Sequence, residues 1–132
     1  MILLIRSDEP QAELYLLDIQ KVFAKDKWLA ERRLANELLP HIEALLKDSG
    51  TKLADLDGIG VFTGSGSFTG LRIGATVANT LAYSLGIPIV VGQGSGWQKQ
   101  AVEKLTNGGA EHIIVPSYER PANITQPKSQ QV

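Results

Sequence analysis

The most constraining feature of this sequence is a strand, a glycine-rich turn and a long apolar helix that follow one another directly. Residues 58–62 (Gly-Ile-Gly-Val-Phe) predict a short buried strand. Residues 71–85 contain no proline and no acidic residue, and they predict a helix. The turn between them includes Ser67 and Thr69, either of which can cap the first free N–H groups of that helix. Because backbone donors and the positive end of a helix dipole converge at such a turn, it is a candidate anion site.

Further strands are predicted on both sides of this unit. Residues 2–5 and 13–18 are apolar runs separated by a polar turn, which favours a β-hairpin followed by a third strand near residues 21–25. Residues 86–92 predict a strand parallel to the one at 58–62, joined to it by the crossover helix. We therefore expect an α/β fold with a mixed five-stranded sheet, in which antiparallel hairpin strands join parallel strands and helices pack on the sheet.

Two more helices are expected, one before the central strand and one at the end of the predicted domain. Residues 28–47 carry apolar side chains at helical spacing in a wide stripe. Pro40 lies inside this segment, where it removes one backbone hydrogen bond at a cost of about 3 kcal/mol, so we expect a kink there. His41 follows and is expected at the surface or in a groove. The last helix is expected over residues 96–105.

Composition excludes several classes of protein. The chain has 132 residues, a hydrophobic content of 43%, a net charge of −1 and no cysteine. Without cysteine there is no disulfide framework, thiolate metal site or cysteine nucleophile. No apolar run reaches the roughly 18 residues of a membrane-spanning helix, so we expect no membrane contact and a cytoplasmic location. The slight negative charge disfavours nonspecific binding of nucleic acid, so contact with RNA is expected only through a partner.

Residues 64–74 (Gly-Ser-Gly-Ser-Phe-Thr-Gly-Leu-Arg-Ile-Gly) resemble the signature of the bacterial TsaB (YeaZ) family, which takes part in tRNA threonylcarbamoyladenosine biosynthesis. The family usually has proline where this chain has Ser65. Residues 38–46 resemble the Leu-Leu-Pro helix of the family, and residues 113–121 resemble its extreme C-terminus. The resemblance implies a single domain with the actin-like, RNase H-like fold of the actin, hexokinase and Hsp70 superfamily.

The resemblance also implies how the chain is divided. Residues 1–106 are expected to form the actin-like N-terminal domain, and residues 107–121 a short C-terminal strap packed against it. Residues 122–132 are rich in proline, glutamine and serine and are expected to be disordered. The second domain that the family places after the first is expected to be absent. Because that domain supplies the adenosine pocket in actin-like enzymes, no cofactor is expected.

The turn of the first hairpin departs from the pattern of the superfamily. Arg6 falls about where the superfamily has an aspartate that approaches phosphate and metal, and Asp8 is displaced from that position. The turn Asp8-Glu9-Pro10 contains no glycine and adds negative charge. It therefore lacks the backbone donors and the φ > 0 flexibility that a phosphate-binding turn needs. We interpret the nucleotide function of this turn as lost, and no metal site is expected.

Three classes of function remain open. The resemblance favours a non-catalytic subunit that binds and supports a TsaD-like catalytic subunit and, through it, a TsaE-like ATPase. This complex makes threonylcarbamoyladenosine at position 37 of tRNA, and tRNA would be met only within it. The first alternative is a small anion- or nucleotide-binding module that uses the 64–70 loop, although this loop is not a Walker A motif. The second is a nuclease-like enzyme that uses Asp8, Asp18 and Asp57, whose convergence on metal ions is not expected.

The helix after the loop supplies the expected contact surface. Gly70, Gly74 and Ala78 lie on one face at i, i+4 and i+8, and such small residues suggest close approach of another helix. The alternative is packing against the domain's own sheet. The family pairs this helix and the preceding one with their counterparts in TsaD or in a second copy, so a homodimer is the other expected assembly. Arg72 points off the stripe and could meet an anion or a partner carboxylate. The predicted partner-binding residues are Leu38, Ile42, Gly70, Gly74, Val77, Ala78 and Leu81. The predicted anion-binding residues are Gly64, Ser65, Gly66, Ser67, Thr69 and Arg72.

Overall fold

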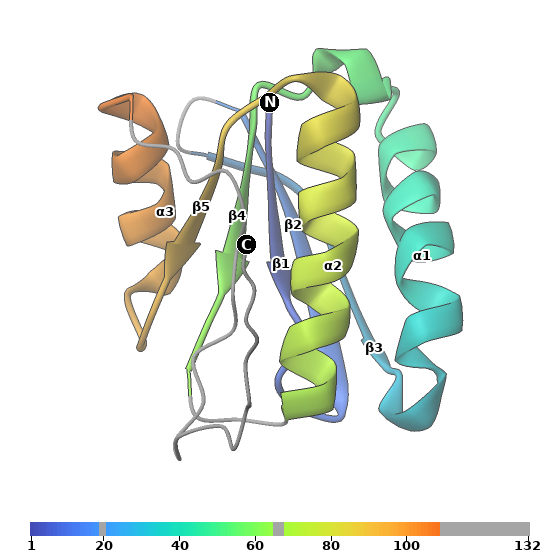
Figure 1. Ribbon diagram of the computed structural model, residues 1–132. Coiled ribbons are helices and arrows are strands. Elements are labelled where there is room, and N and C mark those ends of the chain that lie inside the picture. The colour runs from blue at the N-terminus through green and yellow to red at the C-terminus, as the bar shows by residue number, and fades with distance from the viewer. Residues whose placement is uncertain (19–20, 65–67, 109–132) are drawn as a thin grey trace.

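A mixed sheet with helices on both faces forms the domain, as the computed structural model shows for residues 1–18, 21–64 and 68–108 (Figure 1). The strands lie in the order β3-β2-β1-β4-β5, which confirms the predicted α/β fold and five-stranded mixed sheet. The elements in chain order are β1 (Ile2–Arg6), β2 (Gln11–Asp18), β3 (Lys21–Leu29), the short 3-10 helix η1 (Glu31–Arg33), α1 (Leu34–Asp48), the 3-10 helix η2 (Leu53–Asp55), β4 (Gly58–Phe62), α2 (Phe68–Leu85), β5 (Ile89–Gly92) and α3 (Trp97–Thr106).

The third strand is longer than the sequence predicted. β2 pairs with β3 along the whole length of β2, and Trp28 lies opposite Ala12 in this antiparallel ladder. The helix expected at 28–47 therefore begins at Leu34. The prediction was wrong at this end because pairing along the sheet edge outweighs a helical pattern that extends only a few residues into the strand. The same helix passes through Pro40 without being divided, with Pro40 on its exposed side.

Parallel pairing joins the hairpin to the central strand–turn–helix unit. β1 pairs with β4, and β4 pairs with β5, both in parallel. Parallel neighbours need a crossover connection, and α2 supplies it between β4 and β5. This arrangement confirms the crossover that the sequence predicted.

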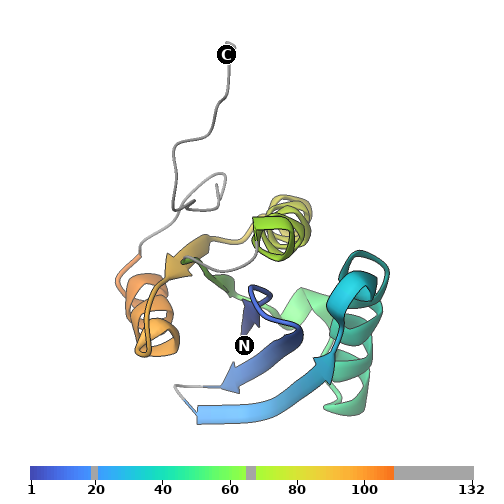
Figure 2. The same cartoon turned by 90° about the horizontal axis from the view of Figure 1, so that it is seen from below.

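Helices α1 and α2 cover one face of the sheet, and α3 lies on the other face (Figure 2). Because side chains alternate along a strand, β1 sends Leu3 and Ile5 into the core beneath α1 and α2 and sends Leu4 into the core beneath α3. The larger core lies on the side of α1 and α2. Those two helices are thus fixed to the sheet by their buried faces, and their opposite faces point outward.

Several predicted segments fall outside the described residues. These are the central loop residues 65–67 and residues 109–132, which hold most of the expected strap and all of the expected tail. α3 ends at Thr106 with Asn107 as its C-cap, and the domain boundary expected after residue 106 stays a prediction. Within the described ranges, none of the helices combines the length and the apolar character needed to cross a membrane.

Candidate interaction surface on helices α1 and α2

The small residues of α2 face the protein's own sheet. In the turn after β1, Ser7 Oγ donates a 2.7 Å hydrogen bond to the carbonyl oxygen of Gly70. A Cβ atom added at Gly74 would collide with the Ser7 hydroxyl, and Ala78 is fully buried. The close approach predicted from these small residues is therefore real, but it occurs against the end of β1. The expectation that this stripe contacts another protein is corrected accordingly.

Two predicted contact residues on α1 are also in the interior. Leu38 and Ile42 have 0% of their surface exposed and pack in the core beneath α1 and α2. Val77 and Leu81 are half-buried at the margin of the same core. Only Val77 and Leu81, among the predicted partner-binding residues, retain accessible surface. The apolar spacing correctly located a buried face, but the face is buried by the chain's own sheet.

The outward face of α2 carries exposed side chains with almost no charge. Arg72 is the only charged residue in this 18-residue helix, and Tyr83 is 90% exposed. A solvated helix surface is normally rich in charged residues, whereas surfaces that partners cover are depleted of them. Five exposed residues recur at intervals of three and four, which keeps them on one side of the helix, and Ser84 is exposed beside the last of them. We call them the outer stripe: Thr69, Arg72, Thr76, Thr80 and Tyr83.

A groove of about 410 Å³ lies between α1 and α2 beside the outer stripe. Its lining consists of Ala35 from α1 with Thr69, Arg72, Ile73, Thr76 and Val77 from α2. A second hollow of about 470 Å³ shares Thr69 and Ile73 with the groove and extends to the turn between β1 and β2. The second hollow also has charged residues in its lining, which are Asp8, Glu9, Glu31 and Arg32. In the groove between α1 and α2, Ile73 and Val77 are half-buried apolar side chains, which suits contact with another helix.

Arg6 holds the turn between β1 and β2. Its Nε atom donates to Asp8 Oδ1 at 2.8 Å and its Nη2 atom donates to Asp8 Oδ2 at 3.3 Å. The guanidinium also lies 4.0 Å from the ring centroid of Phe62. The hydrogen bond to Asp8 is the main cause of the raised pKa of Arg6. Since the Asp8 carboxylate is buried and neutralised by this cation, it is a poor candidate for binding a metal ion or accommodating phosphate.

The three aspartates of the nuclease interpretation do not converge. Asp8 follows the carboxyl end of β1, whereas Asp57 lies at the opposite end, where its Oδ2 accepts a 2.7 Å hydrogen bond from the amino group of Met1. Asp18 pairs with Lys21 at that same opposite end. Among residues 1–18, 21–64 and 68–108, no three histidine, aspartate or glutamate side chains are grouped to hold a metal. The described residues therefore give no support to two-metal catalysis.

An aromatic cluster lies on the other face of the sheet, beneath α3. Tyr15 meets Trp97 edge-on with ring centroids 6.2 Å apart, and Phe62 meets Trp97 in the same way at 5.7 Å. The Tyr15 hydroxyl donates a 2.6 Å hydrogen bond to Glu13 Oε1. Burial, and then this hydrogen bond, raise the pKa of Tyr15 to about 12. The cluster packs α3 onto the sheet and keeps the Tyr15 phenol neutral.

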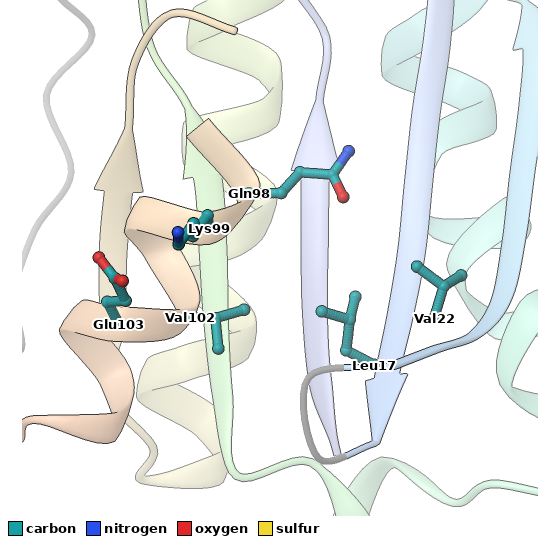
Figure 3. Close-up of a pocket in the computed structure, with 6 residues that line it drawn as sticks. All are labelled: Leu17, Val22, Gln98, Lys99, Val102 and Glu103. Atoms are coloured by element: carbon teal, nitrogen blue, oxygen red, sulfur yellow. The ribbon is translucent and has the colours of Figure 1, made fainter. Parts of the chain in front are cut away.

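A cavity of about 340 Å³ lies between α3 and the ends of β2 and β3 (Figure 3). Its aliphatic lining comes from Leu17, Val22 and Val102, and all of its polar side chains come from α3. Those polar side chains are Gln98, Lys99 and Glu103. A catalytic centre needs a nucleophile or a general base held by a second polar group, and among the described residues no hydrogen bond or ion pair joins Lys99 to Glu103.

The predicted anion loop is only partly described. Ser65, Gly66 and Ser67 lie outside the described residues, while Gly64 is half-buried. Thr69 and Arg72 are exposed and belong to the outer stripe. In the described part of the chain, Arg72 makes no ion pair or hydrogen bond. Anion binding at this loop stays a prediction.

An N-terminal antiparallel meander joined to a parallel strand–turn–helix crossover defines this chain as an actin-like α/β domain. Residues 27–92, which are 66 of the 132 residues, match the family model described as TsaD: tRNA N6-adenosine threonylcarbamoyltransferase. The chain belongs to this family, and its similarity to TsaB and YeaZ proteins makes it a member of the TsaB (YeaZ) group. The names of these relatives place those proteins in tRNA threonylcarbamoyladenosine biosynthesis.

The relatives match only part of their own lengths. The tRNA threonylcarbamoyladenosine biosynthesis protein TsaB of Haemophilus influenzae is 39% identical over 62 residues, which are 47% of this chain and 26% of that protein. TsaB of Bacillus subtilis is 51% identical over 51 residues, or 39% of this chain and 22% of that protein. The tRNA N6-adenosine threonylcarbamoyltransferase of Chromobacterium violaceum is 44% identical over 62 residues, or 47% of this chain and 18% of that protein.

The solved structure of YeaZ from Pseudomonas aeruginosa has a TM-score of 0.65 to this chain and 28% sequence identity. The likeness covers 70% of this chain and 43% of that one. The matched segments thus span about a quarter or less of these curated relatives and under half of the YeaZ chain.

Proposed function

We propose that this chain is a non-catalytic subunit of the assembly that makes N6-threonylcarbamoyladenosine at position 37 of tRNA. In this proposal it docks on a TsaD-type catalytic subunit through the outward faces of α1 and α2, and meets a TsaE-type ATPase through that subunit. The observation that carries the proposal is the outer stripe, an exposed helix surface with one charge in 18 residues. Depletion of charged residues is typical of surfaces that a partner protein covers.

The chemistry of this face favours a protein partner over direct contact with RNA. Proteins hold nucleic acid chiefly through several lysine or arginine contacts to phosphate. The outer stripe offers Arg72 as its single cation, and the chain carries a net charge of −1. Threonine side chains and an exposed tyrosine ring fit instead into a protein interface with a modest hydrophobic centre. We therefore assign contact with tRNA to the assembled complex.

The proposal that this chain is non-catalytic is supported by the turn between β1 and β2, where Arg6 is already paired with the Asp8 carboxylate. An actin-like domain that handles nucleotide needs donors and a free carboxylate at this turn, and here Arg6 engages Asp8 through two nitrogen atoms. Glu9 lies 3.6 Å from the same guanidinium and adds negative charge that repels phosphate. In the cavity beneath α3, no hydrogen bond or ion pair among the described residues joins Lys99 to Glu103. The chain thus contributes surface and shape to the complex rather than reacting groups.

Both helices of the proposed docking face are held to the sheet by contacts within the chain. α2 is fixed by the Ser7–Gly70 hydrogen bond, and α1 is fixed to the sheet edge by its contacts with β3. Preformed interfaces lose less conformational entropy on binding than disordered ones, so a small face can still bind with useful affinity. Val77 and Leu81, at the margin between the two helices, would be the apolar part of this interface.

Co-elution with the purified TsaD-type subunit of the source organism tests the proposal. The two proteins are expected to elute together in size-exclusion chromatography, and the chain is expected to raise formation of threonylcarbamoyladenosine in a reconstituted reaction. Separate elution at concentrations well above those in the cell, with no effect on the modification, would reject it.

The anion-binding alternative is tested in a separate titration. Calorimetry with ATP and Mg²⁺ is expected to show no tight binding to the isolated chain. A micromolar dissociation constant that Arg72→Ala weakens would instead favour the small nucleotide-binding module.

A further inference from the structure

We infer that the outer edge of β3 binds an extended acidic segment of another protein, which adds to the five-stranded sheet as a further strand. The inference concerns the edge of the sheet rather than the outer stripe on α2, and it does not depend on the proposed function. It rests on three features of β3, which are a long backbone edge, two exposed lysines on one face and a groove on the other.

The backbone of β3 offers a ladder for an added strand. β3 has nine residues, more than the about five or six that are usual for a strand. Its inner side pairs with β2, and among residues 1–18, 21–64 and 68–108 no strand pairs with its outer side. Such an edge presents N–H and C=O groups that a further strand can pair with. The opposite edge strand, β5, has only four residues, and Lys104 Nζ donates to its Val91 carbonyl oxygen at 2.8 Å.

Lys25 and Lys27 give one face of this edge a positive charge. The ladder with β2 is regular here, so both side chains point to the face of Tyr15, which lies opposite Lys25 and packs beneath α3. Glu13 lies opposite Lys27, but its Oε1 atom already accepts a hydrogen bond from the Tyr15 hydroxyl. In the described part of the chain, neither lysine takes part in an ion pair. Opposite charges on adjacent strands stabilise a sheet, so these lysines favour acidic side chains on the added strand.

The other face of the edge has a groove of about 560 Å³ between β3 and the end of α1. Phe23 and Ala24 of β3 and Leu45 of α1 form the apolar part of its lining, and Phe23 is 53% exposed. Asp26 and Asp48 also line the groove, so an acidic side chain on this side would meet like charge. An added strand that alternates acidic and apolar residues satisfies both faces, because successive side chains of a strand point to opposite faces.

The lysines select an acidic strand over a second copy of β3. Symmetric antiparallel pairing of two β3 strands about their middle residue would place Lys25 opposite Lys25 of the other copy. Moving the centre of symmetry by one residue would place Lys25 opposite Lys27 of the other copy. Like charges directly opposite each other are destabilising, and lysine on an exposed edge is a common protection against self-pairing. The same charges attract a strand of opposite sign.

Fluorescence anisotropy with labelled peptides tests the inference on the full chain. The probe is Thr-Glu-Val-Glu-Val-Glu-Thr, whose glutamates share one face of an extended strand. The controls are a scrambled peptide of the same composition, Thr-Glu-Glu-Glu-Val-Val-Thr, and a basic peptide, Thr-Lys-Val-Lys-Val-Lys-Thr. The probe is expected to bind at least about fivefold more tightly than either control. Equal binding of the probe and the scrambled peptide would reduce the contact to charge attraction and overturn the inference.

Charge reversal tests the role of the lysines. Lys25→Glu and Lys27→Glu are each expected to weaken binding of the acidic probe by about 3- to 10-fold, because each sets like charge beside the peptide glutamates. The double variant is expected to prefer the basic peptide. Lys52→Glu, at an exposed position outside β3, makes the same change of charge and is the matched control, which should bind the probe within about twofold of wild type. Circular dichroism checks that each variant is folded.

Hydrogen exchange followed by NMR locates the contact. Binding of the probe is expected to slow exchange at alternate backbone N–H groups of β3, since every second residue of an edge strand points its N–H group outward. Absence of binding, binding without added protection in β3, or an equal loss of binding in Lys52→Glu would overturn the inference. None of these measurements involves the TsaD-type subunit, so their failure would leave the proposed function intact.

Discussion

Trp28 and His41 stack face to face, with ring centroids 3.7 Å apart and an interplanar angle of 5°. Trp28 belongs to the edge strand β3 and His41 to α1, so the stack joins the helix to the sheet. His41 Nδ1 lies 2.6 Å from Asp26 Oδ2, and Trp28 Nε1 donates to Glu37 Oε1 at 3.2 Å. These contacts clamp α1 to β3 on the side away from α2. They fix one of the two helices that form the proposed docking face.

Replacing His41 with alanine should loosen this clamp. The change removes the ring stack and the hydrogen bond to Asp26, and it is expected to lower the free energy of unfolding by about 1–2 kcal/mol. Urea denaturation followed by tryptophan fluorescence measures the loss. Asn36→Ala, at an exposed position of the same helix, is the control, and its free energy of unfolding should stay within about 0.5 kcal/mol of that of the wild type. Equal urea denaturation midpoints for wild type and His41→Ala would show that the contacts of His41 contribute nothing to the stability of the fold.

A leucine at position 74 should destabilise the monomer. Gly74 lies against Ser7 and the side chain of Ile5, so an added side chain must displace the end of β1. Overpacking of this kind typically costs about 1–3 kcal/mol. Thr76→Leu, two residues away on the outer stripe, should leave the melting temperature nearly unchanged. If Gly74→Leu has the same melting temperature as the wild type, Gly74 does not face the sheet.

The fold was largely predictable from local patterns. The β-branched and apolar run at 58–62 and the uninterrupted apolar helix after it have only one reasonable arrangement, and the structure has both elements. The N-terminal hairpin was predictable for the same reason. The end of β3 was not, because Trp28 and Leu29 fit both a strand and a helical stripe until the pairing with β2 decides between them.

The candidate site was harder to predict because spacing shows that a face is buried but not what buries it. Gly70, Gly74 and Ala78 have the spacing of a helix contact, and the element they contact is β1. The useful signal was the lack of charge along residues 68–85, which distinguishes the outward side of α2 from an ordinary solvated face. The pairing of Asp26 with His41 joins positions 15 residues apart and depends on how α1 lies on β3.

Stability should fall at alkaline pH through Tyr15. The phenol has a pKa of about 12 in the folded chain, against about 10 in an unfolded chain. A raised pKa means that the folded state favours the neutral phenol, so this contribution is complete below about pH 10 and disappears as the pH rises to about 12. Urea denaturation of wild type and Tyr15→Phe across this range should show the advantage of wild type shrinking with rising pH.

Absorbance of the phenolate measures the ionisation directly. The difference between wild type and Tyr15→Phe isolates Tyr15 from the other tyrosines of the chain. A Tyr15 phenolate that forms near pH 10 in the folded protein would contradict the burial and the hydrogen bond to Glu13.

The affinity of this chain for the TsaD-type subunit, measured by calorimetry with Thr76→Arg beside wild type, tests the central claim most directly. Thr76 lies at the centre of the outer stripe and makes no contribution to the core, so the arginine should leave the fold intact. A long charged side chain at the centre of a helix–helix interface is expected to weaken binding at least about tenfold, which corresponds to about 1.4 kcal/mol. Lys99→Glu should bind like wild type, and circular dichroism should show all three proteins folded. A folded Thr76→Arg chain that binds as tightly as wild type, or a wild-type chain that does not bind at all, would contradict the account.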